Sequence, residues 1–269
     1  MNLYPWQEKA WAELKRANVK QHHASLFIGP LGSGLEKLAN TFATSLICRN
    51  LTDTKKACGK CQDCQWILTE HPNLKVVNNE AEEGTSKNIS IESIRNLKKF
   101  FELSSHIIGG NKVILINNTE SLTLNAANAL LKILEEPPEN SYLILTADNI
   151  SSLLPTIVSR CVIVPAPRPS REEAESFLKV KGFESLSSQL PLFNNLPLDV
   201  IAQRGNSDLF TIIINEFKKG KDFELMAIEP RWLTGHFTET ICLLQKWLYE
   251  IFLFKMTTKF HFFESNKEN

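Results

Sequence analysis

The sequence predicts an α/β protein built on a parallel sheet with helices on both faces. Short apolar runs alternate with longer amphipathic segments over the first part of the chain, as in repeated strand–helix units. The run Lys112–Asn117 is apolar without alternation, which is expected for a parallel strand buried on both faces. A glycine loop, Gly29–Gly34, directly follows the apolar run Ala24–Ile28 and precedes a helical pattern. This order is typical of a phosphate-binding loop in a P-loop fold.

Composition restricts the class of protein. The chain has 269 residues, of which 43% are hydrophobic and 22% charged, so it is long enough for one large domain or two to three small ones. Thirty basic residues balance thirty acidic ones, which leaves no overall field to attract nucleic acid. The polar and aromatic start of the chain predicts no export signal, and no apolar run reaches the length of a membrane span. We therefore expect a soluble, cytoplasmic protein with no membrane partner.

Each element of the expected sheet has a place along the chain. Tyr4-Pro-Trp-Gln7 opens a helix, because proline is favoured in a first helical turn, and Ser90 is the expected N-cap of a later helix. Pro137 and Pro138 stop another helix. The strands are expected at residues 24–28, 74–77, 112–117, 142–146 and 162–165, and the helices at residues 35–47, 90–103, 123–136 and 153–158.

The glycine loop lacks the residues that bind phosphate and magnesium. Gly29, Gly32 and Gly34 lie in the frame of a phosphate-binding loop. The next two positions should be a lysine, which binds the β- and γ-phosphates, and a serine or threonine, which binds magnesium. Here they are Leu35 and Glu36, so the cation is missing and a carboxylate would repel the phosphates. We favour a P-loop fold without nucleotide chemistry, although a simple glycine turn between strand and helix would show the same deficit.

A second position agrees with this loss. In a working P-loop hydrolase, the strand at residues 112–117 ends in an aspartate that holds magnesium. A glutamate that activates water often follows. Here the two positions are Asn117 and Asn118. Because an amide keeps the shape of a carboxylate and loses its charge, we expect no intrinsic ATP hydrolysis.

Four of the six cysteines lie close together in the sequence, at Cys48, Cys58, Cys61 and Cys64. The last three form a doubled C-x-x-C spacing, in which neighbouring thiolates can turn toward one centre. Four thiolates complete the tetrahedral shell of a structural zinc ion and leave no open position for a catalytic water. We therefore predict one structural Zn²⁺ ion held by these four residues. His71 is the alternative to Cys48 as the fourth ligand.

The outer face of the helix expected at residues 90–103 is basic. It carries Arg95, Lys98 and Lys99. Because the charges are few, a solvated surface is the favoured interpretation, and a patch that faces DNA is the alternative.

Beyond the fifth strand the pattern changes from strand–helix alternation to helices alone. Pro165, Pro167 and Pro169 mark a hinge, and Ser170 begins a helix. A small helical region then extends to about Gly205. The remainder is helical and increasingly apolar toward its end.

Taken together, these residues resemble the delta-prime family of subunits of the bacterial DNA polymerase III clamp loader. The similarity spans roughly the first two thirds of the chain. It rests on Tyr4-Pro-Trp, the broken glycine loop, the cysteine-rich insertion, the segment Asn128–Pro138 and Ser159-Arg-Cys161. A helix that ends in Leu-Glu-Glu-Pro-Pro and is followed by Ser-Arg-Cys is highly specific to clamp-loader subunits of the AAA+ type. The broken loop sets this chain apart from the gamma/tau motor subunits.

The resemblance implies three parts. Residues 1–166 form an AAA+ module with the zinc insertion at residues 48–64. Residues 167–205 form a small helical lid, and residues 206–269 form an all-α collar that packs subunits into a ring. The collar is short for the family, which favours an incomplete collar.

The resemblance also implies roles for residues and partners. The four cysteines match the family's zinc ligands. Arg160 matches the arginine finger that clamp-loader subunits project in trans into the ATP site of a neighbour. The implied partners are the gamma/tau ATPase subunits and the delta subunit. The sliding clamp is an indirect partner, and primer-template DNA is contacted inside the assembled complex.

Three functions compete. We favour a non-hydrolysing structural subunit that helps load the sliding clamp onto primed DNA, as an accessory part of a DNA-directed DNA polymerase. The alternative is a catalytically active AAA+ clamp-loader ATPase of the gamma/tau type, and Leu35 and Asn117 argue against it. A zinc-dependent DNA-binding protein is the third, and the neutral net charge argues against it.

Overall fold

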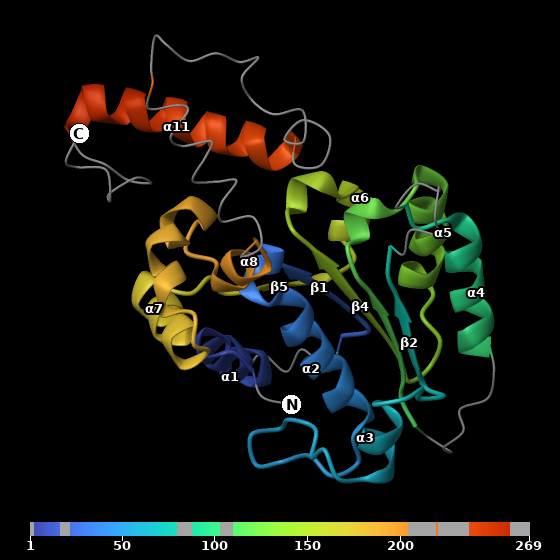
Figure 1. Ribbon diagram of the computed structural model, residues 1–269. Coiled ribbons are helices and arrows are strands. Elements are labelled where there is room, and N and C mark those ends of the chain that lie inside the picture. The colour runs from blue at the N-terminus through green and yellow to red at the C-terminus, as the bar shows by residue number, and fades with distance from the viewer. Residues whose placement is uncertain are drawn as a thin grey trace. The chain divides into compact units, whose positions relative to one another are not determined.

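The computed structural model describes residues 3–16, 22–79, 88–102, 110–203, 219 and 237–258 (Figure 1). The chain divides into two compact units, Met1–Arg168 and Pro169–Asn269. The three-part division into module, lid and collar stays a prediction. None of the helices in the described part of the chain combines the length and the hydropathy that a membrane span requires.

A five-stranded parallel sheet forms the centre of the first unit. Its strands lie in the order β2-β3-β4-β1-β5, so that β1 sits between strands that come much later in the chain. In this register Leu26 of β1 pairs with Leu145 of β4 on one side and with Ile163 of β5 on the other. The strands are β1 (Ala24–Ile28), β2 (Leu74–Val77), β3 (Lys112–Ile116), β4 (Ser141–Ala147) and β5 (Val162–Pro165).

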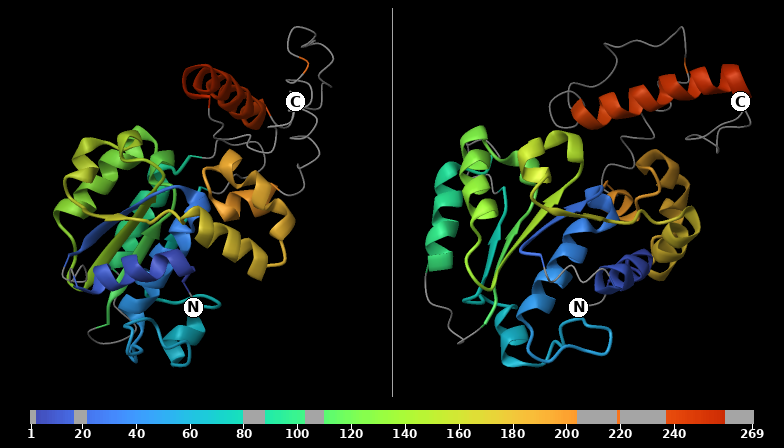
Figure 2. Two further views of the ribbon diagram at one scale, coloured as in Figure 1. Left: turned by 90° about the vertical axis from the view of Figure 1, so that its left-hand side faces the viewer. Right: turned by 180° about the vertical axis from the view of Figure 1, so that it is seen from behind.

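Helices cover both faces of this sheet (Figures 1 and 2). Successive strand residues point to opposite faces, so β3 contributes Ile114 to one hydrophobic cluster and Leu115 to the other. Helices α4, α5 and α6 pack on the first face, and α1 and α2 pack on the second. The helices of this unit are α1 (Glu8–Arg16), α2 (Leu35–Ile47), α3 (Gln62–Trp66), α4 (Ile91–Glu102), α5 (Leu124–Glu135) and α6 (Pro155–Val158). The predicted P-loop-type parallel α/β fold is confirmed.

The helix ends follow the local signals in the sequence. The hydroxyl of Thr123 accepts a hydrogen bond from the backbone N–H of Ala126 at 3.2 Å and caps α5. Ser90 caps α4 in the same way, through Ser93. Short 3-10 turns fill the connections at η1 (Pro5–Gln7), η3 (Leu31–Ser33), η4 (Thr119–Ser121) and η5 (Ile150–Ser152).

A buried lysine closes the other end of α4. Lys112, at the start of β3, is 7% exposed, and its Nζ donates hydrogen bonds to the carbonyls of Phe100 at 2.8 Å and Phe101 at 3.0 Å. The last carbonyls of a helix have no partner within the helix, so a cation placed there satisfies them and interacts favourably with the helix dipole. Burial lowers the pKa of Lys112. The lysine ties the sheet to the helix that covers it.

We expect Lys112→Met to lower the free energy of unfolding by about 1–3 kcal/mol, because hydrogen bonds to a charged group are lost and buried carbonyls remain unpaired. Urea unfolding of the wild-type and variant chains measures this difference. Lys132→Met is the matched control, since Lys132 is exposed on α5 and its change should stay within about 0.5 kcal/mol. Equal unfolding midpoints for Lys112→Met and the wild type would contradict this role.

The described part of the second unit is helical. Ser170 and Glu173 form a capping box at the start of α7 (Arg171–Val180). A long 3-10 segment, η6 (Glu184–Phe193), and α8 (Pro197–Ala202) follow, and this bundle has a small core of Ala174, Leu178, Leu190 and Val200. Of the predicted collar, only residue 219 and α11 (Phe237–Thr257) with the residue after it lie within the described residues.

Candidate functional site

The glycine loop after β1 uses its own backbone N–H groups in hydrogen bonds within the loop, and we call it closed for this reason. Within Leu31–Ser33 the chain makes a 3-10 turn, in which Ser33 N donates to Pro30 O and Gly34 N donates to Leu31 O, both at 2.9 Å. Gly34 has a φ of +80°, which a residue with a side chain rarely adopts. A phosphate-binding loop presents its backbone N–H groups to the ligand. Two of the groups that should do so here are used inside the loop.

The N-terminal segment holds the loop in this form. Trp6 Nε1 donates to Ser33 O at 2.8 Å, and Gln7 Nε2 donates to Gly34 O at 2.8 Å, in buried contacts. Tyr4 packs so closely that a Cβ on Gly34 would lie 2.4 Å from its Cε2. The sequence marks Tyr4-Pro-Trp as a helix start and a family motif, and this contact with the loop could not be predicted from it.

Neither of the two residues that follow the loop replaces the lost lysine. Leu35 is fully buried in the cluster beneath α2, and Glu36 is exposed on the first turn of that helix. The next lysine, Lys37, places its Nζ 4.1 Å from the ring centre of Tyr4, in a cation–π contact. The ammonium group of Lys37, which could otherwise bind a phosphate, therefore contacts Tyr4 of the N-terminal segment.

The ends of β2, β3 and β4 are joined by neutral side chains. Asn117 is 6% exposed, and its Nδ2 donates to Asn78 Oδ1 at 2.9 Å. Asn118 donates in the same way to Asn79 at 3.1 Å, and Thr146 Oγ1 donates to Asn117 Oδ1 at 3.4 Å. The position where a P-loop hydrolase holds magnesium is occupied here by an amide network that carries no charge.

The four cysteines form one cluster at the end of α2. Their Sγ atoms all lie within 4.8 Å of one another, with Cys48 3.8 Å from Cys61 and Cys58 3.9 Å from Cys64. Four sulfurs at the zinc–sulfur distance of about 2.3 Å around one ion are about 3.8 Å apart. The donor set and its spacing therefore fit a tetrahedral metal ion. The described residues contain no other such group of three or more His, Cys, Asp and Glu side chains.

Backbone groups prepare the cluster for a cation. The N–H groups of Lys60 and Cys61 donate to Cys58 Sγ at 3.4 and 3.3 Å, and they lower the pKa of the Cys58 thiol to about 6. Burial raises the pKa of Cys48 and of Cys64. Metal binding needs deprotonated thiols. A bound cation would therefore have to lower the pKa most at the two buried cysteines.

A salt bridge holds Asp63, the residue directly before Cys64 of the cluster. Asp63, which is 1% exposed, pairs with Arg49, whose Nε lies 2.8 Å from Oδ2 and whose Nη2 donates to Oδ1 at 3.4 Å. Asp63 Oδ1 also lies 3.6 Å from His71 Nε2. The second nitrogen of His71, Nδ1, accepts a hydrogen bond from Asn73 N at 3.0 Å. His71 therefore lies between Asp63 of the insertion and the backbone of Asn73.

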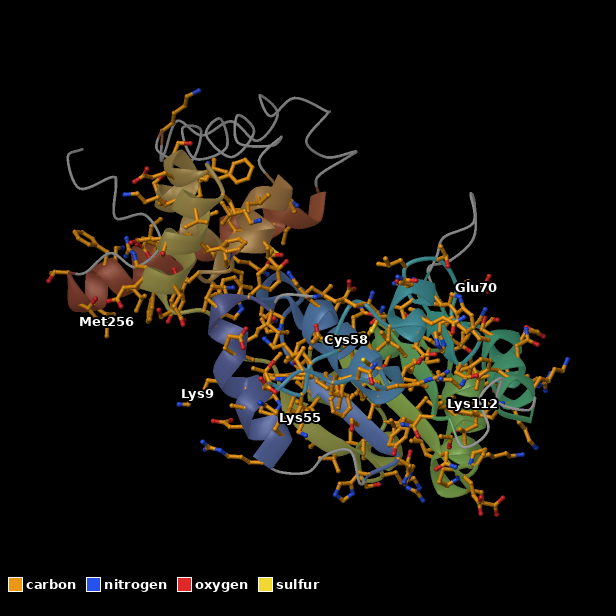
Figure 3. All side chains as sticks on the ribbon, turned by 90° about the horizontal axis from the view of Figure 1, so that it is seen from below. Lys9, Lys55, Cys58, Glu70, Lys112 and Met256 are labelled. Carbon is orange, nitrogen blue, oxygen red and sulfur yellow. The ribbon has the colours of Figure 1, made fainter. Side chains whose placement is uncertain are left out.

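The insertion is also anchored to the first helix. Trp11 Nε1 donates to Thr54 O at 2.9 Å, and Lys56 Nζ lies 2.7 Å from Glu8 Oε1. Figure 3 labels Cys58 and Lys55 of the insertion and Lys9 of α1. These contacts hold the cysteine loop against the module.

Arg160 lies at the surface of the first unit, directly after α6. Its side chain is 36% exposed, and Nη2 donates to Glu135 Oε1 at the end of α5 at 2.7 Å. Nη1 donates to Thr156 O at 2.9 Å and to Ser159 Oγ at 3.3 Å. Arg160 was predicted from the sequence, whereas Glu135, which lies within the Asn128–Pro138 motif, was not.

Comparison with known proteins agrees with these features. Residues 6–169 match the family model described as DNA polymerase III, delta subunit. DNA polymerase III subunit delta' of Pseudomonas aeruginosa is 37% identical over 202 residues, which cover 73% of this chain and 60% of that protein. The same subunit of Haemophilus influenzae is 35% identical (67% and 54% covered), and that of Escherichia coli 30% identical (66% and 53% covered). The chain thus spans a little more than half the length of these curated relatives.

Solved structures give weaker likenesses. A DNA polymerase III gamma subunit-related protein of Thermotoga maritima is 18% identical with a TM-score of 0.43, covering 88% of this chain and 77% of that one. The RuvB Holliday junction branch migration motor of the same organism is 13% identical with a TM-score of 0.45, covering 79% and 64%.

The family match includes most of the first unit, with the closed glycine loop, the four cysteines and Arg160 inside it. The alignments to subunit delta' extend over about two thirds of the chain or more, at 30% identity and above. The chain therefore belongs to the delta-prime family of DNA polymerase III subunits.

Proposed function

We propose that this chain is a non-hydrolysing structural subunit of the replicative clamp loader, which acts in the cytoplasm as an accessory part of DNA polymerase III. Its partners are the gamma/tau ATPase subunits and the delta subunit, with primer-template DNA inside the complex and the sliding clamp as an indirect partner. The observation that carries the proposal is the closed glycine loop, whose N–H groups and neighbouring lysine are engaged within the chain.

The absence of ATP hydrolysis follows from the chemistry of this loop. Phosphoryl transfer depends on positioning and on positive charge around the phosphates and magnesium. Leu35 lies in the core, Asn117 is neutral, and Tyr4 packs on Gly34 where the first turn of α2 begins. The active gamma/tau type of ATPase is the alternative, and each of these residues disfavours it.

We expect the isolated chain neither to bind Mg²⁺-ATP tightly nor to hydrolyse it, because the phosphate cation and the magnesium ligand are both missing. Calorimetric titration with Mg²⁺-ATP and a steady-state ATPase assay on the purified chain test this. A gamma/tau subunit under the same conditions is the positive control. ATP turnover that co-elutes with the chain after all gamma/tau has been removed would contradict the proposal.

The Arg160 finger and the partners rest on the family resemblance. In support, Arg160 is partly exposed and lies after a short helix at the end of which the chain turns into β5. A planar cation with several donors suits the triphosphate of a neighbouring subunit. Co-purification with gamma/tau and delta subunits of the same organism tests the partnership, and failure to enter the complex would contradict it.

We further propose that the cysteine cluster holds one structural Zn²⁺ ion through Cys48, Cys58, Cys61 and Cys64. The sulfur distances support a tetrahedral ion. The contacts of His71 with Asp63 and Asn73 favour Cys48 over His71 as the fourth ligand. A closed sulfur shell leaves no position for a reacting water, so the ion would stabilise the insertion and take no part in chemistry.

A further inference from the structure

Two motifs that are separate in the sequence meet in one ion pair. Glu135 belongs to the Leu-Glu-Glu-Pro-Pro end of α5, and Arg160 belongs to Ser-Arg-Cys after α6. The carboxylate accepts from Arg160 Nη2 at 2.7 Å, while Thr156 and Ser159 accept from Nη1. The guanidinium is thus fixed from two helices, α5 and α6, at three points.

We propose that Glu135 is the positioning residue of the Arg160 finger. This inference rests on the proposed function, in which Arg160 acts on ATP held by a neighbouring subunit. An arginine side chain has several rotatable bonds, and their freedom must be lost before it can contact a phosphate. The contacts with Glu135, Thr156 and Ser159 restrict the arginine side chain to one conformation before the neighbouring subunit binds.

The contacts leave donors for a phosphate. A guanidinium has five N–H donors. The two on Nη1 and one on Nη2 are used by Thr156, Ser159 and Glu135, so Nε and the second N–H of Nη2 remain for an acceptor from another chain. Nε and Nη2 lie along one edge of the planar guanidinium, and such an edge can bind two phosphate oxygens at once.

The ion pair is also weak enough to allow that contact. The side chains of Arg160 and Glu135 are 36% and 50% exposed, so water screens their attraction. An exposed pair of this kind changes an equilibrium by about fivefold at most. An arginine finger contributes on the order of 10³–10⁵ in rate. Glu135 can therefore orient the cation without holding it back from a triphosphate.

The test uses the assembled clamp loader with its gamma/tau and delta subunits. We expect Glu135→Gln to lower ATP hydrolysis at the one site that Arg160 serves by up to about fivefold. The kcat of the whole complex, stimulated by clamp and primed DNA, should therefore fall by less than with Arg160→Ala. The KM for ATP should not change, because the ATP site belongs to the neighbour. Glu136→Gln is the matched control, since Glu136 is the adjacent exposed carboxylate, and it should leave kcat unchanged. In the Arg160→Ala background, Glu135→Gln should have no further effect.

The outcomes separate the inference from the proposed function. If Arg160→Ala lowers kcat and Glu135→Gln does not, Glu135 has no positioning role, while the proposed role of Arg160 as a finger is retained. If Glu135→Gln lowers kcat equally with and without Arg160, it acts through the fold and the inference is wrong. If Arg160→Ala itself leaves kcat unchanged, the finger is wrong and the positioning role falls with it.

Discussion

Cys61→Ser should release nearly all of the metal bound by the purified chain. Protein prepared without added zinc should carry about one ion per chain, because four thiolates bind zinc with a free energy of roughly 10–16 kcal/mol. Cys61 Sγ is 3.8 Å from Cys48 Sγ within the cluster, so its loss removes one corner of the tetrahedron. Elemental analysis of the wild-type and variant proteins measures the change.

The controls identify the ligand set. Cys242→Ser should keep the full metal content, because Cys242 is an exposed cysteine in α11 outside the cluster. Cys48→Ser should lose the ion, and His71→Ala should retain most of it, since His71 contacts Asp63 and Asn73. Unchanged metal in Cys61→Ser would contradict the site, and loss in His71→Ala with retention in Cys48→Ser would make His71 the fourth ligand.

The loss of metal should loosen the insertion and leave the sheet intact. Apart from α3, the loop between Cys48 and Cys64 has no regular secondary structure, and it has few apolar side chains of its own. Its contacts with α1, through Thr54 and Lys56, are few and partly exposed. Limited proteolysis should therefore cut the Cys61→Ser chain between Cys48 and Cys64 faster than it cuts the wild-type chain there.

Local patterns predicted most of the fold. The strand Leu74–Val77 and the helix Leu35–Ile47 appear with the predicted bounds, and Ser90 is the predicted cap of α4. Short apolar runs and capping residues act over a few neighbours in the chain, so a single sequence is enough to find them. The cysteine spacing is equally local, which is why the cluster could be predicted from the sequence.

The contacts that define the sites are not local. Trp6 and Gln7 bind carbonyls of the glycine loop 26 to 27 residues away, and Glu135 meets Arg160 across 25 residues. No periodicity or spacing rule connects such pairs, because they depend on how the sheet brings the ends of its elements together. The missing lysine predicted the absence of phosphate chemistry, whereas the closure of the loop by Tyr4 became visible only in three dimensions.

Arg160→Ala should lower the ATPase rate of the assembled clamp loader while leaving the chain folded. In the transition state of phosphoryl transfer, charge spreads over the γ-phosphate oxygens, and a guanidinium placed there is worth about 10³–10⁵ in rate at the site it serves. Only the site next to this subunit would lose its finger, so the fall for the whole complex should be partial. The steady-state rate with clamp and primed DNA measures it, alongside the rate of clamp loading.

Arg160→Ala should change the stability of the chain only slightly, so a fall in ATPase rate would reflect catalysis and not unfolding. The lost ion pair with Glu135 is about half exposed, so the free energy of unfolding should change by no more than about 1 kcal/mol. Arg171→Ala removes an equally exposed ion pair, with Glu175, and should leave the ATPase rate unchanged. Arg160→Lys should recover only part of the rate, because an ammonium lacks the planar pair of donors. A correctly assembled complex with Arg160→Ala that hydrolyses ATP and loads clamps at the full rate would show that Arg160 does not act in trans.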